Sequence, residues 1–221
     1  IPEKNCLNLY PNEDNCQMYL IEKTEEFDKW LRKLNDLRAK AIILIRLQKI
    51  ENDGHFGDCQ SVGDGIRECK IDFAKGYRIY FKEFGGKLVL LLLGGDKSSQ
   101  QKDVQKAKDI LISSKQLRIM ETSKFDVADY LDSPEMISEY LNAVLAEGND
   151  SDLIVALGNI ARSIGMAKIA SETGMSRPSL YKALSDGSKP QFETVMKVLR
   201  AIGGQLQIKP TTEESSAVHS H

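Results

Sequence analysis

Basic and hydroxyl side chains alternate with apolar ones along two predicted strands, and their types suit the handling of a phosphodiester. Segments 66–73 and 76–83 carry apolar residues at every second position, which is typical of half-buried strands. The alternation places Lys70 on one face of the first strand, and Arg78 and Tyr80 on one face of the second. If helices cover the apolar face, these three side chains lie on the open face of the sheet.

Two further polar residues, Asp96 and Lys97, follow the next predicted strand, 87–95. Arginine and lysine bind phosphate oxygens and offset the negative charge that develops in a transition state. No histidine or pair of carboxylates accompanies them as a conventional general acid and base. Such a site would act by positioning and electrostatics, with an RNA 2′-hydroxyl as internal nucleophile. The alternative is that these residues only form the solvated face of a half-buried sheet.

A second motif, MAKIASETGMSRPSLYKAL at residues 166–184, has the spacing of a helix-turn-helix. Ala170 lets two helices approach closely, and Gly174 supplies the positive φ that the turn requires. Ser176 caps the second helix, whose exposed side would contact DNA. The residues expected at that interface are Ser176, Arg177, Ser179, Tyr181 and Lys182. The alternative is an ordinary pair of core helices.

The first half of the chain, residues 18–115, predicts a compact α+β domain that would position the polar strand residues. A strand (18–23), two helices (25–35 and 38–52), the three strands above and a charged helix (96–115) follow one another. The element order is therefore β-α-α-β-β-β-α. Gly85 and Gly86 between the last two strands are a strong hairpin signal, because glycine enters primed turns without steric cost.

The second half predicts an all-α domain around the helix-turn-helix. We place a linker at 116–123 and the helical domain at 124–210. Ser133 and Pro134 are suited to the N-cap and first position of a helix in this domain. Residues 1–17 form a leader without an assigned role, and residues 211–221 form a polar tail expected to be disordered.

The bulk composition excludes several classes of protein. The net charge of −2 conceals an asymmetry, since residues 18–116 carry +4 and residues 117–221 carry −4; the two halves would attract each other, or the first half would meet a polyanion. No apolar run approaches the roughly 18 residues of a membrane span, and the start lacks a signal-peptide pattern. We expect a cytoplasmic protein that meets no membrane.

The cysteines Cys6, Cys16, Cys59 and Cys69 form no CxxC pair, so we expect reduced thiols, no metal and no cofactor.

A longer run joins the strand motifs of the first half: GDGIRECKIDFAKGYRIYFKEFGGKLVLLLLGGDKSSQQKDVQKAKDIL. With it, residues 18–115 resemble the RelE/ParE toxin superfamily, and in particular its HigB-type addiction module killer proteins. Members with RNase activity cleave mRNA on the ribosome with basic residues of the sheet. The resemblance therefore implies catalytic roles for Lys70, Arg78, Asp96 and Lys97. A late tyrosine that some members use is missing, and Tyr80 is taken as its substitute. ParE relatives instead inhibit DNA gyrase.

The second half contains FDVADYLDSPEMISEYLNAVLAEGND and GMSRPSLYKALSDGSKPQFETVMKVLRAIG. With these segments, residues 117–210 resemble HigA-type antitoxins that carry an Xre-like helix-turn-helix. In such systems the acidic N-terminal helical part grips the toxin. The candidates for that surface are Tyr130, Met136, Ile137, Tyr140 and Leu141. Simple packing in a core is the alternative for these five residues.

Together the two resemblances imply a fused toxin–antitoxin protein. Its first half would be a ribosome-dependent mRNA endoribonuclease, and its second half would neutralise that activity and bind operator DNA, forming a homodimer through the helix-turn-helix half. One alternative is a non-enzymatic transcription regulator that retains a degenerate toxin domain. Another is a ParE-like inhibitor of gyrase. The expected partners are accordingly operator DNA, mRNA on the ribosome, and the other half of the same chain.

Overall fold

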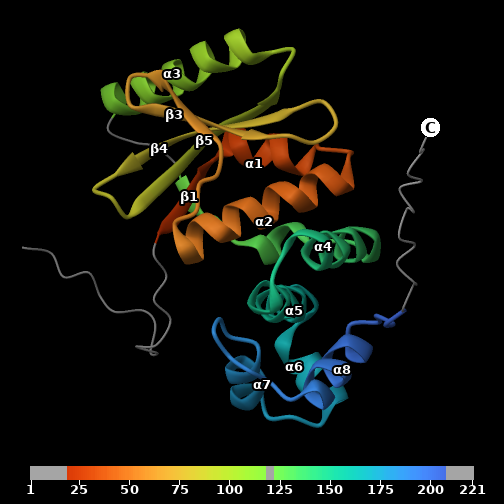
Figure 1. Ribbon diagram of the computed structural model, residues 1–221. Helices are drawn as coiled ribbons and strands as arrows, with labels where there is room; N and C mark the ends of the chain where they lie inside the picture. Colours follow the sequence, from red (N-terminus) through yellow and green to blue (C-terminus); the bar gives the residue numbers. More distant parts are fainter. Residues whose placement is uncertain (1–18, 118–121, 208–221) are drawn as a thin grey trace, which may run out of the picture.

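A six-stranded mixed sheet lies at the centre of the first half (Figure 1). The computed structural model describes residues 19–117 and 122–207. The strands are β1 (Leu20–Thr24), β2 (Cys59–Gly63), β3 (Ile66–Ile71), β4 (Tyr77–Phe84), β5 (Leu88–Asp96) and β6 (Thr122–Lys124). They lie in the order β2-β3-β4-β5-β1-β6. β1 pairs in parallel with β5, and the other neighbouring strands are antiparallel.

Two helices, α1 (Glu25–Arg32) and α2 (Leu37–Asp53), cover one face of this sheet (Figure 1). The side chains of Thr24 and Asp36 accept backbone hydrogen bonds at the two helix starts, and Gly54 ends α2 in the left-handed region at φ 67°. Residues 42–45 of α2 are four consecutive buried aliphatic residues. A helix with buried residues all round must be covered on more than one side. α2 therefore needs a second cover beyond the sheet.

The third helix, α3 (Gln100–Leu117), covers the opposite face of the sheet (Figure 1). Its Ala107 and Leu111 are buried in a cluster with residues of β3, β4 and β5, including Tyr80. Tyr80 is fully buried, and Arg78 is only 8% exposed.

The prediction that Lys70, Arg78 and Tyr80 share an open face is therefore wrong. β5 is apolar on both faces, so its second face needs a cover, and the apolar stripe of α3 supplies it. Burying one leucine side chain in this way contributes about 1.5–3 kcal/mol, which exceeds what a solvated polar face would gain. Of the three residues, Lys70 alone keeps a substantially exposed side chain, at 31%.

Two short edge strands depart from the predicted element order. β2 lies in a segment for which the sequence predicts no element; it is polar and pairs antiparallel with β3. β6 begins inside the predicted linker 116–123, ends at Lys124 just beyond it, and pairs with β1, where the Thr122 hydroxyl donates to Glu22 at 2.7 Å. An edge strand of three to five residues carries too few alternating apolar positions to be recognised.

Gly94 of β5 lies against the indole of Trp30, which occupies the space that a Cβ at Gly94 would need. We expect Gly94→Ala to lower the free energy of unfolding by about 1–3 kcal/mol through overpacking. Gly86→Asn is the control, because Gly86 has open space around it and asparagine tolerates its φ of 72°. Urea unfolding of both variants checks this. Equal midpoints for the two would contradict it.

The second half is a series of helices that descends from the α2 side of the sheet (Figure 1). It consists of a 3₁₀ turn η1 (Val127–Tyr130), α4 (Pro134–Glu147), α5 (Asp150–Ile164), α6 (Met166–Thr173), α7 (Arg177–Ala183) and α8 (Phe192–Ala201). As predicted, Ser133 caps α4 and Pro134 follows at its first position. The predicted leader 1–17 and tail 211–221 lie outside the described residues.

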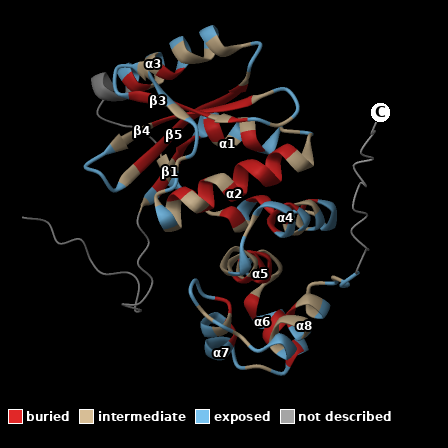
Figure 2. Ribbon diagram, viewed as in Figure 1, coloured by how far each residue is buried: buried red, intermediate tan, exposed pale blue. Residues whose placement is uncertain are grey.

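The two halves share one hydrophobic core. Met136 and Tyr140 of α4 are fully buried in the same cluster as Ile43 and Leu44 of α2. Figure 2 shows buried positions running from the sheet through α2 into α4 and α5. α4 is therefore the second cover that the apolar outer side of α2 requires.

Among the residues described, no single helix is long and apolar enough to cross a membrane. α5 and α6 reach that length and apolarity only as a pair, which is bent by 109°.

Candidate functional site

α6 and α7, two short helices joined by a turn, lie where the sequence predicts a helix-turn-helix. Gly174 ends α6 with φ 68°, in the left-handed region that the turn requires. The Ser176 hydroxyl accepts a hydrogen bond from the backbone N–H of Ser179 at 3.2 Å and so caps α7. Leu180 and Leu184 are buried in a cluster with α5, α6 and α8. The remaining face of α7 is therefore left to solvent.

The residues predicted to contact DNA all lie exposed at this helix. They are Ser176, Arg177, Ser179, Tyr181 and Lys182. Ser179 and Lys182 also line an open pocket of about 520 Å³ with the loop 185–190, which contributes Lys189. Arg177, Lys182 and Lys189 form no ion pair within residues 19–117 and 122–207. Arg177 at the capped start of α7, Lys182 in its last turn and Lys189 in the loop that follows are suited to phosphate contacts, although Asp186 lines the same pocket.

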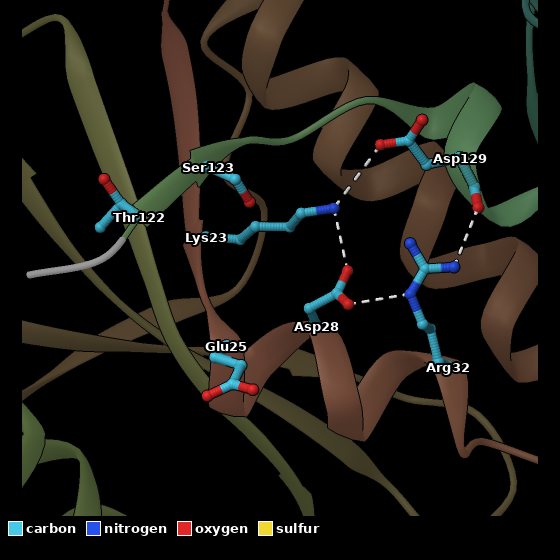
Figure 3. Close-up of a pocket in the computed structure, with 7 residues that line it drawn as sticks. All are labelled: Lys23, Glu25, Asp28, Arg32, Thr122, Ser123 and Asp129. Atoms are coloured by element: carbon cyan, nitrogen blue, oxygen red, sulfur yellow. Dashed lines mark hydrogen bonds and ion pairs between the residues drawn. The ribbon is translucent and has the colours of Figure 1, made fainter.

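A charged cluster joins the first half to η1 (Figure 3). Lys23 of β1 has a side chain only 5% exposed, and its Nζ lies 2.9 Å from Asp28 and 3.7 Å from Asp129. Arg32 lies 2.8 Å from Asp28 and donates to the Asp129 carbonyl at 3.2 Å. These residues line an open pocket of about 400 Å³, whose charges are already paired with one another.

Tyr130 lies within this cluster and completes it. Lys23 donates to the Tyr130 hydroxyl at 2.9 Å, and that hydroxyl donates to Asp28 at 2.7 Å. Burial would raise the pKa of the Asp28 carboxyl, but hydrogen bonds from Arg32, Tyr130 and Lys23 outweigh it and hold this pKa well below its usual range. Burial and the bond to Asp28 raise the pKa of the Tyr130 hydroxyl. The Asp28 carboxyl therefore stays ionised and the Tyr130 hydroxyl stays protonated around neutral pH.

A second polar contact joins α2 to α4 and α5. The Tyr140 hydroxyl donates to Oε1 of Gln48 at 2.5 Å, and the Asn159 amide donates to the same oxygen at 3.0 Å. Met136 is fully buried beside them in the shared core. The other two predicted contact residues, Ile137 and Leu141, pack against that core while partly exposed. The structure thus places all five predicted contact residues at or beside the junction between the halves.

Glu51 of α2 faces the second half at this junction. Burial raises the pKa of its carboxyl to about 7; Lys124 opposes the rise, Asp126 adds to it and Arg162 opposes it. An acid whose pKa is higher in the folded state binds more protons there than in the unfolded state. The contribution of Glu51 to the free energy of unfolding must therefore fall as the pH rises from 4.5 to about 7.

We expect Glu51→Gln to remove this part of the pH dependence, because glutamine does not titrate. Urea unfolding of wild type and variant at about pH 5 and about pH 8 measures the effect. The wild type should lose more stability than the variant between the two values. Parallel behaviour of the two proteins would show that Glu51 titrates normally in the folded chain.

The helices at and beyond this junction are similar to known proteins. A family model described as "Probable addiction module antidote protein" matches residues 121–210. A protein of Haemophilus influenzae described as uncharacterized is 53% identical over 88 residues, which is 40% of this chain and 88% of the relative. A second uncharacterized protein of the same organism is 49% identical over 85 residues, or 38% and 88% of the two chains. The C-terminal region belongs to the addiction module antidote family.

The antidote region, residues 121–210, thus has an antitoxin-like role in a toxin–antitoxin system, and the family implies a toxin as its partner. No solved structure matches the chain. The residues of the antidote region that hydrogen-bond to the first half include Tyr130 and Tyr140, from η1 and α4. α6 and α7 lie at the far end of this region from the sheet (Figure 1).

Four of the predicted catalytic residues gather at one end of the sheet. The register places Lys70 opposite Arg78, Arg78 opposite Gly95, and Tyr77 opposite Asp96. Lys97 follows Asp96 and is exposed without an ion pair among the described residues. Asp96 accepts from the backbone N–H of Ser98 at 2.9 Å, and its hydrogen bonds with Ser98 lower the pKa of its carboxyl.

Arg78 and Tyr80 are not available as the sequence predicted. Arg78 donates to the buried Glu68 at 3.1 Å and to the Gly76 carbonyl at 3.0 Å. Tyr80 has a buried hydroxyl without a hydrogen-bond partner in the described chain, and burial raises the pKa of that hydroxyl. Lys70 is paired with Asp58 at 3.6 Å and stays partly exposed. The accessible polar groups of the sheet end are therefore Lys70, Asp96 and Lys97.

Glu68 and Gln100 are the two site residues that sequence reasoning missed. Gln100, at the start of α3, donates to Glu68 at 2.9 Å, so α3 adds a second hydrogen-bond donor to the carboxylate that pairs with Arg78. The strand alternation that placed Lys70 on this face also places Glu68 there, so the arginine–glutamate pair had a sequence signal. None of Lys70, Arg78, Asp96 and Lys97 bonds to a described residue of the antidote region.

Proposed function

We propose that the protein is a single-chain toxin–antitoxin module. Its first half is a RelE/ParE-like, HigB-type endoribonuclease that acts on ribosome-bound mRNA, and its antidote region restrains that half and binds operator DNA. The observation that carries the proposal is the junction: an antidote region buries η1 and α4 against the chain's own first half. An antidote acts on a toxin partner, and in this proposal the partner is the first half of the same chain, against which η1 and α4 are buried.

The restraint acts at a distance from the accessible sheet-end residues. The antidote region covers α1 and α2, whereas Lys70 and Lys97 lie at the end of the sheet and form no hydrogen bond or ion pair with its described residues. In this proposal the antidote region sterically prevents the first half from entering its ribosomal site, while the sheet-end residues themselves stay accessible. Covalent linkage gives an effective concentration of about millimolar, so the restrained state is the resting state.

Growth assays on the separated halves test the toxin–antidote relation. Induced expression of residues 18–117 should arrest growth, the full chain should not, and residues 118–221 supplied from a second promoter should restore growth. Circular dichroism of the purified fragment shows whether it is folded. A folded, soluble fragment that leaves growth unaffected would contradict the proposal.

DNA binding is assigned to the exposed face of α7. Its capped start and the cations Arg177, Lys182 and Lys189 are suited to phosphate and base contacts in a major groove. One helix-turn-helix reads a half-site, so two copies of the chain would read a two-fold symmetric operator.

We expect Arg177→Ala to weaken binding to DNA from upstream of the chain's own gene by about 1–3 kcal/mol, which is about 5- to 150-fold. The reason is that Arg177 is exposed at the helix start and forms no ion pair with a carboxylate in the described part of the chain. Arg200→Ala is the matched control, because Arg200 is an exposed arginine on α8, outside the helix-turn-helix. Mobility-shift titrations at fixed salt compare the two. Equal losses for both variants would remove α7 from the interface.

A second candidate function is a non-enzymatic regulator with a degenerate toxin domain. Two observations favour it: Arg78 is ion-paired with Glu68, and Tyr80 is buried under α3. Neither side chain is therefore accessible to an RNA substrate. This reading predicts DNA binding by the full chain and no RNA cleavage by the first half. Replacing the sheet-end lysine Lys70 by alanine distinguishes this alternative from the first proposal.

A further inference from the structure

Two cysteines lie directly opposite each other on the edge of the sheet. The register pairs Cys59 of β2 with Cys69 of β3, and both are free thiols. The Lys70 N–H donates to the Asp58 carbonyl at 2.9 Å, so a backbone bond lies just beyond the cysteine pair. In an antiparallel ladder this makes Cys59 and Cys69 a non-hydrogen-bonded pair, with Cα atoms about 4.5 Å apart. That separation is within the range of disulfide bonds.

The two sulfurs converge on one backbone oxygen. Sγ of Cys59 lies 3.3 Å and Sγ of Cys69 lies 3.2 Å from the Phe56 carbonyl oxygen. Nη1 of Arg46 donates to the same oxygen at 3.1 Å and holds the loop in place. The two thiols therefore lie on the same face of the sheet and within contact distance of the same oxygen atom.

The two thiols differ in access and in charge environment. Cys59 is half-exposed on the edge strand, whereas Cys69 is 1% exposed. The neighbouring Cys69 thiol lowers the pKa of Cys59 and outweighs the effect of burial, and Arg67 and Arg46 lower it further. The Cys59 thiol and burial both raise the pKa of Cys69. A peroxide would therefore meet Cys59 first, as the more acidic and more accessible of the two.

We propose that Cys59 and Cys69 form a peroxide-sensitive dithiol that closes to a reversible disulfide. The Cys59 thiolate attacks one oxygen of hydrogen peroxide, the O–O bond breaks, and Cys59 becomes a sulfenic acid as hydroxide leaves and takes up a proton as water. The Cys69 sulfur then attacks the Cys59 sulfur, the S–O bond breaks, and hydroxide leaves with the Cys69 proton as a second water. Two thiols are oxidised and one peroxide is reduced to two waters.

The disulfide would close beside the sheet-end lysine. Asp58 precedes Cys59 and Lys70 follows Cys69, and these flanking residues form the ion pair at 3.6 Å. Joining the two strands would hold Lys70 against Asp58. Given the proposed function, oxidation would lower the activity of the first half; the thiol chemistry itself does not depend on that function.

Mass spectrometry of the oxidised full chain tests the proposal. Cys6→Ser and Cys16→Ser in the same chain leave Cys59 and Cys69 as its thiols. Hydrogen peroxide should remove two hydrogens from the intact mass, digestion should give one peptide pair joined through Cys59 and Cys69, and dithiothreitol should reverse the change. Cys69→Ser in this background should trap Cys59 as a sulfenic acid that dimedone labels, whereas Cys59→Ser should leave Cys69 unoxidised.

Three results would overturn the proposal. The first is that, after peroxide treatment of the folded chain, iodoacetamide still alkylates both thiols once the chain is unfolded. The second is that Cys59 proceeds to a sulfinic acid while Cys69 remains a thiol. The third is that the two single variants react with peroxide equally, since the order of attack requires Cys59 to react first. The readout is thiol chemistry, so a failure of toxicity in the fragment assay would leave it untouched.

Discussion

Replacing Asp28 by asparagine is expected to destabilise the protein by about 3 kcal/mol, because it leaves a buried lysine without its main counter-ion. Lys23 is 5% exposed and loses its partner at 2.9 Å, while Arg32 remains next to the same site. Asp129, at 3.7 Å, compensates only in part. The cost falls on the junction itself, since Lys23 belongs to the first half, and Asp129 and Tyr130 belong to the antidote region.

Glu25→Gln is the matched control for this substitution. Glu25 lines the same pocket from the same helix, but it is 70% exposed and pairs with Lys29 on the surface. Exposed pairs of this kind contribute at most about 1 kcal/mol. Urea unfolding at neutral pH compares the two variants. Equal losses for Asp28→Asn and Glu25→Gln would show that the junction does not depend on the buried cluster.

The effect of Asp28→Asn also has a defined pH dependence. The pKa of Asp28 lies below its usual value of 3.8 in the folded chain, so its stabilising effect is present above that pH and is lost as the pH falls further. The difference in stability between wild type and variant should therefore be constant near neutrality and should narrow in acid. If the difference in free energy of unfolding between wild type and Asp28→Asn instead grows as the pH falls, the ionised Asp28 does not stabilise the folded chain.

Lys70→Ala in the separated first half is expected to lower RNA cleavage by about 100- to 1,000-fold, because it removes a cation that stabilises charge in the transition state. Lys70 is the suitable choice at the sheet end, since its pair with Asp58 is long and partly exposed, so its removal has little structural cost. Arg78→Ala is a poor substitute. It would leave the fully buried Glu68 without its cation and so would destabilise the fold.

Lys87→Ala is the control with the same change of charge. Lys87 is exposed in the turn between β4 and β5, at the opposite end of the sheet from Lys70. Cleavage rates of the two variants on a ribosome-bound message are compared after circular dichroism has shown that both are folded. If the Lys70→Ala and Lys87→Ala variants cleave RNA at equal rates, the sheet end is not the catalytic surface. That result would favour the non-enzymatic regulator with a degenerate toxin domain.

The parts of this fold that sequence predicted well are those fixed by local chemistry. Ser133 with Pro134, Ser176 and Gly174 each define a helix end within one turn of the chain, and the structure has all of these ends in place. The exposed residues of α7 follow directly from its two buried leucines and the helical period. For the same reason the exposure of the residues predicted to contact DNA could be predicted from the sequence.

The errors concern contacts between distant segments. The open face of the sheet is closed because α3, which follows the strands, returns across it and buries Tyr80. Lys23 and Tyr130 are separated by 107 positions, and neither carries a local signal of the other. β6 exists as a strand only because β1 offers an edge to it. Alternation identifies which residues share a face, but not which element covers that face.

Primer extension on mRNA tests the central claim most directly, namely that the first half is a ribosome-dependent endoribonuclease restrained by its own antidote region. Messages from cells expressing residues 18–117 should show new 5′ ends within translated regions. These ends should disappear when residues 118–221 are co-expressed, when translation initiation is blocked, and in cells expressing the full chain. A folded fragment that produces no new ends, or that damages DNA while leaving mRNA intact, would contradict this account.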